Sequence, residues 1–388
     1  MKYDFDELID RRGTDCVKWD SEPAGVLPMW VADMDFKTAP CITEALKKRV
    51  EQGIFGYTRV PESYYDAVTG WFADRHGWHI ERDRIIYTSG VVPALSAIIK
   101  AETRPGDKVI LQTPVYNCFF SSVRNNGCII AENRLLRRGD TYEMDFDDLE
   151  LKASDPAVRL MLLCNPHNPC GRVWRRDELK RVADICARHG VTVVSDEIHC
   201  ELVMPGYEYV PFASLSPETE RMSVTCLSPS KAFNIAGLQI ANIVCSDPDR
   251  RARIDRAIND NEVCDVNPFG VVALQEAYRH GADWLDQLNV YLHGNYEYMI
   301  DFCRRELPRY PVMKLEGTYL AWMDVSALGI PVAILEQRLV DDARLRLNAG
   351  TMYGEAGEGY MRWNLACPRA RLADGLARFA AFCKPSEL

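Results

Sequence analysis

The sequence predicts an α/β protein, with a mostly parallel central sheet in a large domain and a smaller α+β domain that both termini form. Short apolar runs alternate with polar helical stretches between about residues 84 and 246, which is the pattern of a parallel sheet. Beyond about residue 250 the pattern changes to long helices that are rich in charged and aromatic residues. Because no polar linker or internal repeat separates these regions, we expect the two domains to be interleaved.

The first half of the chain begins with turns and continues with helices and strands. The segment LPMWVADMDF (27–36) is expected to be either a packed N-terminal arm or a wall of a substrate pocket. Apolar residues at helical spacing predict helices over 41–53 and 63–77, and a turn between them carries Tyr57. Strands are predicted over 84–89 and 108–113, and a helix is predicted to open at Gly90.

The second half supplies the remaining strands and a long helix. Strands are predicted over 159–164, 192–196, 223–228, 241–246, 318–324 and 360–365, and helices over 175–190 and within 281–307. We therefore expect three parts: an N-terminal arm with part of the small domain (1–45), a large domain (46–284) and a C-terminal small domain (285–388).

Composition argues against several classes of protein. The chain has 388 residues and a formal net charge of −10, which disfavours general binding to nucleic acid or to anionic membranes. The start, MKYDFDELIDRR, has no apolar signal region, and no apolar run reaches the length of a membrane span. The 14 cysteines form no CxxC pair, so we expect reduced, buried thiols in a cytoplasmic protein and no metal site.

Three polar residues that follow predicted strands suggest a pyridoxal phosphate site. Lys231, in the segment SPSKAFNIAGLQ (228–239), supplies an amine that can form a Schiff base with an aldehyde. Asp196 ends an apolar strand, where a carboxylate can keep the ring nitrogen protonated. Asn168, in the turn NPHNPCG (165–171), can donate to the ring oxygen. Taken singly, each of the three also allows a plain role: a surface lysine for Lys231, a cap or turn for Asp196 and a turn for Asn168.

Other residues suit the cofactor phosphate and an amino-acid substrate. Backbone N–H groups at a helix start bind phosphate, and residues 89–92 offer them directly after a predicted strand. Ser228 and Ser230 flank the lysine and add hydroxyl groups. Tyr116, at a strand end, can stack on a flat ring, and Arg362 is the candidate for a two-point clamp on a carboxylate.

These motifs resemble the fold-type I pyridoxal phosphate enzymes of the class I/II aminotransferase superfamily. More narrowly, the chain resembles the MalY/PatB subgroup of cystathionine β-lyases, which are also described as carbon–sulfur lyases. The resemblance runs nearly end to end, through GTDCVKWD, LPMWVADMDF, FGYT, SGVVPALSAI, TPVYNCFF, NPHNPCGRVW, SDEIHCEL, SPSKAFNIAGLQ, GTYLAWMD and RWNLACPR. It implies the fold of the pyridoxal-phosphate-dependent transferases, with the cofactor in the large domain.

For the cofactor, the resemblance implies a role for each matching residue. Lys231 forms the covalent link, Asp196 pairs with the ring nitrogen, and Asn168 bonds the ring 3-oxygen. Tyr116 and Ile198 pack on the two faces of the ring. The phosphate is held by Gly90, Val91, Val92, Ser228 and Ser230.

For the substrate and the assembly, the resemblance implies contacts at both ends of the site. Arg362 binds the α-carboxylate, and Ala32, Asn168 and Tyr57 are further expected substrate contacts. Tyr57 also reaches a phosphate in the neighbouring subunit, which implies a homodimer. His199 lies three positions after Asp196, where aminotransferases place a tyrosine near the 3-oxygen, and its role stays open.

One position distinguishes the lyase subgroup from typical aminotransferases. Typical aminotransferases carry an arginine eight residues after the lysine, and here that position is Gln239, as in the lyase subgroup. A smaller departure is Ser89, where the subgroup often has proline. The resemblance implies a β-lyase that cleaves L-cystathionine or related L-cysteine S-conjugates to a thiol, pyruvate and ammonia. An aminotransferase, and a regulatory or binding protein that carries the cofactor and has weak lyase activity, stay open as alternatives.

Overall fold

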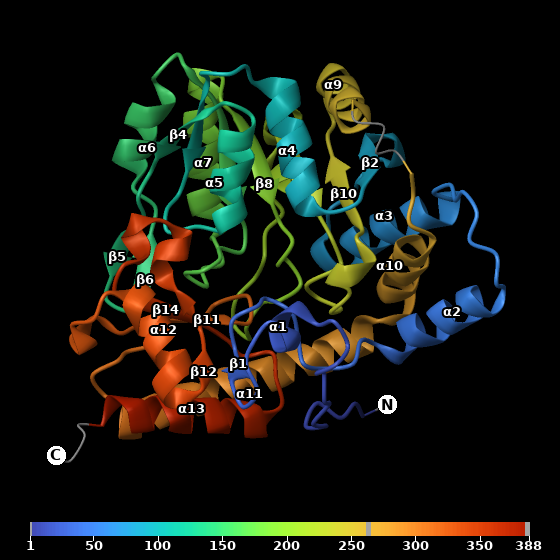
Figure 1. Ribbon diagram of the computed structural model, residues 1–388. Coiled ribbons are helices and arrows are strands. Elements are labelled where there is room, and N and C mark those ends of the chain that lie inside the picture. Colours follow the sequence, from blue (N-terminus) through green and yellow to red (C-terminus); the bar gives the residue numbers. More distant parts are fainter. Residues whose placement is uncertain (1, 261–264, 385–388) are drawn as a thin grey trace.

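A seven-stranded sheet with helices on both faces lies above a smaller α+β body in the computed structural model, which describes residues 2–260 and 265–384 (Figure 1). The strands of the large sheet are, in spatial order, β2 (Ile85–Thr88), β10 (Ala241–Val244), β9 (Ser223–Leu227), β8 (Thr192–Asp196), β7 (Val158–Cys164), β3 (Lys108–Leu111) and β4 (Ile129–Glu132). Neighbouring strands are parallel except at β10, which is antiparallel to both β2 and β9. The predicted mostly parallel sheet is therefore confirmed.

The central strands are buried along nearly their whole length, as expected for parallel strands covered on both faces. Alternate residues of a strand point to opposite faces. Leu160, Leu162 and Val194 pack under α4 (Val91–Glu102), α5 (Asn117–Asn125) and α9 (Pro248–Asn259). Met161 and Val193 pack under α6 (Phe146–Ala153) and α7 (Arg176–His189) on the other face. These two layers fix the sheet whose carboxyl edge carries the motifs.

The smaller body is built from both ends of the chain. It contains the antiparallel sheet of β11 (Leu320–Asp324), β14 (Tyr360–Asn364) and β13 (Asn348–Ala349), packed with α11 (Ala282–Glu306), α12 (Val332–Ala343) and α13 (Arg369–Cys383). The N-terminal strand β1 (Leu27–Pro28) pairs in parallel with β12 (Leu345–Arg346), next to α1 (Val17–Asp20). The expected contribution of both termini is confirmed, whereas the domain boundaries at residues 45 and 284 stay a prediction.

The predicted helices and strands agree with the structure to within about two residues. The helix predicted over 41–53 is α2 (Pro40–Glu51), that over 63–77 is α3 (Glu62–His76), and that within 281–307 is α11. Several other elements were not predicted. They include the hairpin of β5 (Leu136–Arg138) and β6 (Thr141–Glu143), and α10 (Pro268–His280), which packs against α2 and α3.

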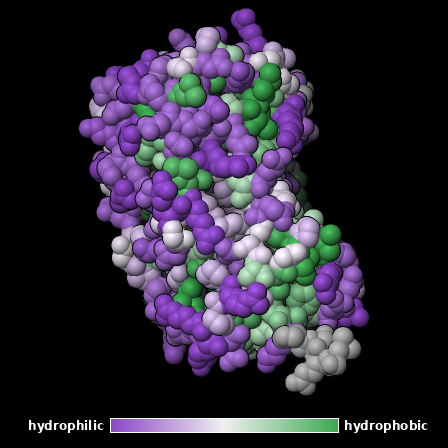
Figure 2. All heavy atoms as spheres, turned by 90° about the vertical axis from the view of Figure 1, so that its left-hand side faces the viewer, coloured by the Kyte–Doolittle hydropathy of each residue, from purple (hydrophilic) through white to green (hydrophobic). Residues whose placement is uncertain are grey.

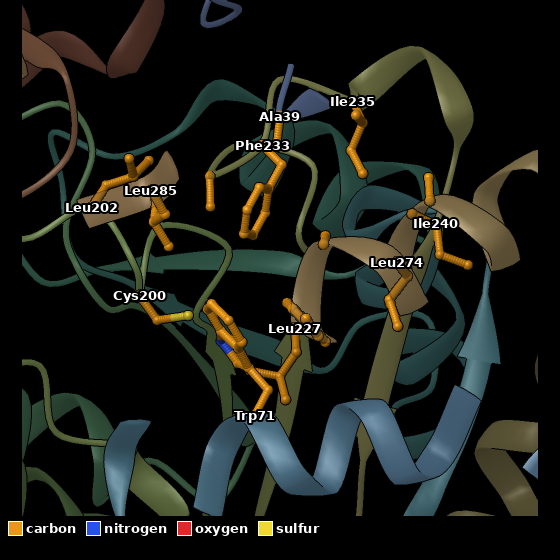
Figure 3. Close-up of a cluster of buried hydrophobic side chains, with 14 of the residues drawn as sticks. Ala39, Trp71, Cys200, Leu202, Leu227, Phe233, Ile235, Ile240, Leu274 and Leu285 are labelled. Atoms are coloured by element: carbon orange, nitrogen blue, oxygen red, sulfur yellow. The ribbon is translucent and has the colours of Figure 1, made fainter. Parts of the chain in front are cut away.

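An aromatic cluster supports the loop that carries Lys231 (Figure 3). Phe233, two positions after the lysine, is fully buried and stacks on Trp284 with ring centroids 5.8 Å apart. Trp71 of α3 meets Phe233 edge-on at 6.0 Å. Aromatic contacts of this kind have preferred geometries, so this cluster anchors the loop that carries Lys231, named here the lysine loop.

The face turned toward the viewer in Figure 2 is dominated by hydrophilic side chains, and apolar residues form several groups, the broadest of them at the lower right. Within the described part of the chain, none of the helices has both the length and the apolar content that crossing a membrane requires.

Candidate functional site

A cavity of about 550 Å³ lies at the carboxyl edge of the large sheet, where it meets the smaller body. Strands β2, β3, β7, β8 and β9 all end toward this edge, so the segments that follow them converge. The predicted site residues among its lining are Ala32, Gly90, Val91, Val92, Tyr116, Asn168, Asp196, Ile198, His199, Ser230, Lys231 and Arg362. Ala32 and Arg362, which are 330 positions apart in the sequence, are thereby brought around one cavity.

The amine of Lys231 lies in this cavity and donates a hydrogen bond to the carbonyl oxygen of Ala32, 2.7 Å away. The hydroxyl of Tyr319 donates to the same oxygen at 2.9 Å. Burial, and then the positive charge of Arg362, lower the pKa of Lys231 to about 8. With this pKa about a tenth of the amine is uncharged at pH 7, far more than for an ordinary lysine, and the uncharged amine is the nucleophilic and basic form.

Asp196, the last residue of β8, is a buried carboxylate in the same cavity. Its Oδ1 accepts a hydrogen bond from the backbone N–H of Ile198 at 3.1 Å. Burial raises the pKa of Asp196 to about 7, and the neighbouring Glu197 adds to this rise. A buried carboxylate of this kind favours a cationic or proton-bearing partner, such as a protonated ring nitrogen.

Asn168 and Arg362 are linked across the cavity. Arg362, in β14, is 4% exposed, and its Nη1 donates to Oδ1 of Asn168 at 3.1 Å. Its Nη2 donates to the carbonyl oxygen of Trp30 at 2.8 Å, and the guanidinium lies over the ring of Tyr353 at 4.9 Å. These contacts hold a planar cation in one orientation, which suits two-point binding of a carboxylate.

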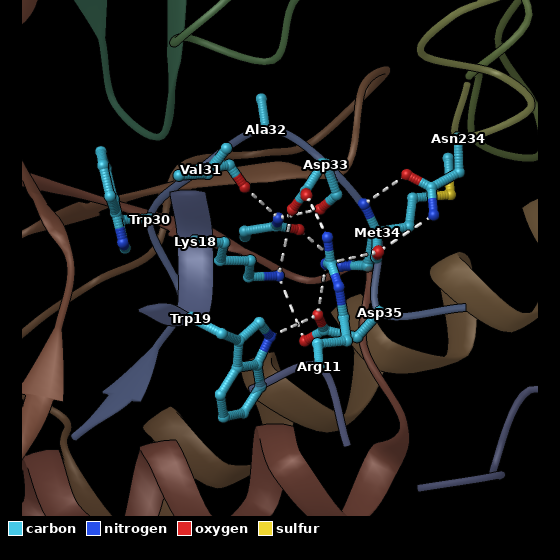
Figure 4. Close-up of polar contacts among 12 residues, drawn as sticks. Arg11, Lys18, Trp19, Trp30, Val31, Ala32, Asp33, Met34, Asp35 and Asn234 are labelled. Atoms are coloured by element: carbon cyan, nitrogen blue, oxygen red, sulfur yellow. Dashed lines mark hydrogen bonds and ion pairs between the residues drawn. The ribbon is translucent and has the colours of Figure 1, made fainter. Parts of the chain in front are cut away.

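Residues 30–36, named here the strap, run past the cavity, which Trp30, Val31 and Ala32 line (Figure 4). Asn234 holds the strap from the lysine loop, because its amide bonds the backbone of Met34 and Phe36 at 2.8–3.0 Å. Asn364 holds it from β14, with hydrogen bonds to the carbonyl oxygens of Val31 and Asp33 at 2.5 and 2.6 Å. The carbonyl of Ala32, which meets Lys231, is therefore fixed from both sides.

A buried charge cluster underlies the strap (Figure 4). Lys18 and Asp35 are 1% and 2% exposed, and their charged atoms are 3.1 Å apart. Arg11 bonds Asp33 at 2.7 Å and Asp35 at 2.9 Å. Although burial opposes it, the charge of Lys18 and the hydrogen bond from Trp19 hold the pKa of Asp35 below its usual range.

The segment 27–36, which was expected to be either a packed arm or a pocket wall, is both. Trp30, Val31 and Ala32 line the cavity, and Met34 and Phe36 join the core.

The first turn of α4 presents its backbone to the cavity. Gly90 is the N-cap of the helix, and Gly90, Val91 and Val92 line the cavity. The first N–H groups of a helix have no intrahelical partner and attract anions. Ser230 also lines the cavity, whereas the hydroxyl of Ser228 lies outside its lining and bonds Ser230 and the carbonyl of Ile240. Ser228 thus supports Ser230 in this structure, and its predicted contact with phosphate stays a prediction.

Tyr116 and Ile198 both line the cavity, whereas Tyr57 is 99% exposed and outside its lining. Burial raises the pKa of Tyr116, so its hydroxyl stays protonated. The predicted roles of these three residues in stacking and in the neighbouring subunit stay predictions.

Sequence reasoning missed one wall of the site. Asn348, Met352 and Tyr353 line the cavity, and Asn348 is paired with Arg362 across β13 and β14. Its amide also donates to the carbonyl of Trp30 at 3.1 Å. These residues lie in a two-residue strand and a short helical turn, whose patterns are too brief to detect. The one available signal was their position shortly before the strand that carries Arg362.

Comparisons with known proteins agree with this geometry. The sequence model of "Aminotransferase class I and II" matches residues 25–379. The chain belongs to the class I and II aminotransferase family. Cystathionine β-lyase PatB of Bacillus subtilis is 47% identical over 97% of this chain and 99% of its own length, and protein MalY of Escherichia coli is 34% identical over 97% of both chains. The predicted membership of the MalY/PatB subgroup is confirmed.

A solved structure with a similar sequence shows the same fold. Cystalysin from Treponema denticola superimposes with a TM-score of 0.95, is 36% identical, and is covered over 98% of both chains. Its crystal structure contains a pyridoxal 5′-phosphate cofactor. The predicted fold class is therefore confirmed.

Proposed function

We propose that this chain is a pyridoxal 5′-phosphate-dependent carbon–sulfur β-lyase, which cleaves L-cystathionine or related L-cysteine S-conjugates to a thiol, pyruvate and ammonia. The observation that carries the proposal is the convergence of the Lys231 amine, the buried Asp196 carboxylate and the Arg362 guanidinium on one cavity. The name of the relative that is 47% identical, cystathionine β-lyase, supports the same reaction.

The residues present fit this cofactor. Asp196 is a buried carboxylate with a raised pKa, which a protonated ring nitrogen would satisfy. The first turn of α4 and Ser230 would hold the phosphate, Asn168 would face the ring oxygen, and Tyr116 and Ile198 would enclose the ring. When bound, pyridoxal 5′-phosphate supplies an aldehyde that bonds amines and a ring that withdraws electrons from the substrate α-carbon.

The chain's own residues then act on the substrate and its protons. Arg362 binds the α-carboxylate and orients the Cα–H bond. The Nζ of Lys231 takes the α-proton as general base, which its lowered pKa favours. Asp196 holds a proton on the ring nitrogen, so that negative charge at the α-carbon is stabilised while the thiolate leaves the β-carbon.

A coupled assay tests the reaction type. L-cystathionine supplied without a 2-oxo acid is expected to yield pyruvate, ammonia and free thiol in equal amounts. An aminotransferase would instead stop after one turnover until a 2-oxo acid was added. A protein that loads the cofactor and forms no pyruvate from any cysteine S-conjugate would contradict the proposed function.

Replacing Arg362 with lysine is expected to raise KM and lower kcat together, because lysine keeps the charge but loses the planar two-point grip. Removing one charged hydrogen bond costs about 1.5–3 kcal/mol, so kcat/KM should fall about tenfold or more. Steady-state kinetics measure this. Cofactor binding should be unchanged, and the exposed Arg338→Lys serves as the matched control.

A second substrate, in which the cysteine-side α-carboxylate is amidated, tests whether Arg362 is the residue that binds this carboxylate. The wild type should discriminate strongly against it and Arg362→Lys only slightly. Equal discrimination by both proteins would show that another residue binds the carboxylate.

We also propose a homodimer in which Tyr57 completes the neighbouring site. Apolar side chains around it are exposed to an unusual degree, at 69% for Ile54, 56% for Phe55 and 99% for Tyr57. A contiguous apolar group of this kind is typical of a surface that another protein covers. Association would bury it, so a second copy of this chain is the proposed partner.

Replacing Tyr57 with phenylalanine is expected to weaken retention of pyridoxal 5′-phosphate about tenfold, the effect of one lost hydrogen bond to an anion. Dilution to monomers should release cofactor from the wild type as well. Equilibrium dialysis and sedimentation velocity measure the two effects. A cofactor-saturated, active monomer would contradict both.

A cytoplasmic location is proposed as well. The thirteen cysteines within residues 2–260 and 265–384 are all free, and most are buried. Free thiols of this kind are typical of a reducing compartment.

A further inference from the structure

Tyr319 is a fully buried tyrosine that shares one hydrogen-bond acceptor with the amine of Lys231. It immediately precedes β11, and its side chain is 0% exposed. Its hydroxyl donates to the carbonyl oxygen of Ala32 at 2.9 Å, and the same oxygen accepts from the Nζ of Lys231 at 2.7 Å. A carbonyl oxygen has two lone pairs, so one is occupied by the phenol and the other by the amine.

The backbone that leads into Tyr319 is strained. Thr318 has a φ of 69°, in the left-handed region, which is rare for a β-branched residue and costs about 1–3 kcal/mol. Its N–H donates to the carbonyl of Leu202 at 2.7 Å, and its hydroxyl oxygen accepts from the N–H of Leu320 at 3.1 Å. Strain of this size persists only where the surrounding structure fixes it, so the turn before β11 holds Tyr319 in one position.

The ring and hydroxyl of Tyr319 have little freedom of their own. The ring packs edge-on against His199, with centroids 6.1 Å apart. Burial, and then the charge of Asp33, raise the pKa of the Tyr319 hydroxyl, so the hydroxyl stays protonated and donates. Within residues 2–260 and 265–384, the oxygen of Ala32 is the one atom to which this hydroxyl donates. The tyrosine therefore acts on the position of that carbonyl.

Three consecutive carbonyls of the strap are held by side chains from the antiparallel sheet of the smaller body. Asn364, in β14, bonds those of Val31 and Asp33, and Tyr319, next to β11, bonds that of Ala32 between them. Asn364 does not reach the middle carbonyl, so its direction is set by Tyr319. The lysine side chain is a flexible four-carbon stem, and the place of its amine therefore depends on the atom that it bonds.

We propose that Tyr319 is a positioning residue for Lys231, which places the free amine at the substrate α-carbon by fixing the Ala32 carbonyl that the amine bonds. The inference rests on the proposed function, in which the Nζ of Lys231 takes the α-proton. In that step the Cα–H bond breaks, an N–H bond forms at Nζ, and the electron pair stays on the substrate. Because proton transfer requires a short and aligned approach, loss of the hydroxyl should slow this step first.

Tyr319→Phe removes the hydroxyl and keeps the ring that packs on His199. The matched control is Tyr310→Phe, because Tyr310 is another buried tyrosine of the smaller body, packs edge-on against Phe379, and lies outside the cavity lining. The first measurement uses the cofactor-loaded proteins and L-alanine in deuterium oxide. L-alanine has no leaving group on its β-carbon, so loss of its α-proton signal in the proton NMR spectrum reports proton removal alone.

Two further measurements separate positioning from a general defect of the site. Absorption titrations give the dissociation constants of pyridoxal 5′-phosphate and, for the loaded protein, of L-alanine. Both should be nearly unchanged, because Tyr319 lies outside the cavity lining. Crystal structures of the cofactor-free wild type and variant give the distance between the Nζ of Lys231 and the oxygen of Ala32.

The expected result for Tyr319→Phe is an exchange rate that falls about tenfold, the effect of one lost hydrogen bond, with both dissociation constants within about twofold of the wild type. The amine should have left the Ala32 oxygen, and Tyr310→Phe should match the wild type throughout. An unchanged exchange rate would overturn the inference, as would an amine that still lies 2.7 Å from that oxygen. A parallel loss of cofactor affinity would overturn it too, because it would show a general distortion of the site.

The proposed function can fail separately from this inference. A wild type that exchanges the α-proton of L-alanine but forms no pyruvate from L-cystathionine would refute the lyase reaction and leave the role of Tyr319 standing. A wild type that takes up no cofactor would also refute the proposed function. The two cofactor-free structures would then still decide whether Tyr319 places the amine of Lys231.

Discussion

Replacing Lys231 with alanine is expected to abolish turnover and the visible absorption band that the lysine-bound cofactor gives. The variant removes the amine that lies in the cavity at 2.7 Å from the Ala32 carbonyl. It thereby removes both the covalent link to the cofactor and the base for the α-proton. General bases alone contribute about 10²–10⁴-fold, so a loss of at least that size is expected. Absorption spectra and pyruvate release measure the two effects.

The fold of this variant should be intact, because the lysine loop is anchored by Phe233 rather than by the amine. Lys180→Ala, at an exposed position, is the control for the substitution itself. Borohydride reduction followed by peptide mapping provides the opposite test. A labelled cofactor adduct on another lysine, with full activity, would refute the assignment of Lys231.

Replacing Asp196 with asparagine is expected to lower turnover about a hundredfold or more, which corresponds to ~2.7 kcal/mol of barrier. The substitution is nearly isosteric, and the backbone N–H of Ile198 can still donate to the side-chain oxygen. What is lost is the negative charge that favours a protonated ring nitrogen. Single-turnover kinetics, with the cofactor fully bound, measure this effect apart from cofactor loss.

The control is Asp184→Asn, which makes the same chemical change at an exposed position of α7. A fall of less than about tenfold for Asp196→Asn, ~1.4 kcal/mol, would mean that Asp196 does not face the ring nitrogen. Normal turnover with a much weaker cofactor affinity would also contradict the catalytic role of Asp196, because it would show that the residue only helps to bind the cofactor.

The parts of the fold that the sequence predicted share a physical cause. Strands such as 192–196 are buried on both faces, so their apolar runs are continuous and easily detected. The long helix α11 has many turns over which its pattern repeats. By contrast, β12 and β13 have two residues each, and no periodicity can be read from so few positions.

The residues of the candidate site also fall into those that the sequence predicted and those that it did not. Asp196 ends a detectable strand, and Lys231 and Asn168 follow others, so their convergence follows from the rule that the carboxyl ends of parallel strands share an edge. Asn348 and Tyr353 reach the cavity through the pairing of short strands, and Trp30 through contacts with residues more than 300 positions away. Contacts at such separations depend on the whole tertiary structure, which local patterns do not contain.

The strap also sets an order of events during synthesis. The chain just before it is fixed by the pairing of Leu27 with Leu345, and the strap itself is held by the amides of Asn234 and Asn364. A growing chain emerges N-terminus first, so Asp196, Lys231 and Asn234 are available long before the partners in β12 and β14 exist. The Ala32 carbonyl, near the N-terminus, can therefore take its place beside Lys231 only after the C-terminal strands have been synthesised. A chain truncated before β14 is expected to form the large sheet but to lack a complete cavity. Only chains that are translated almost to their end can therefore become active.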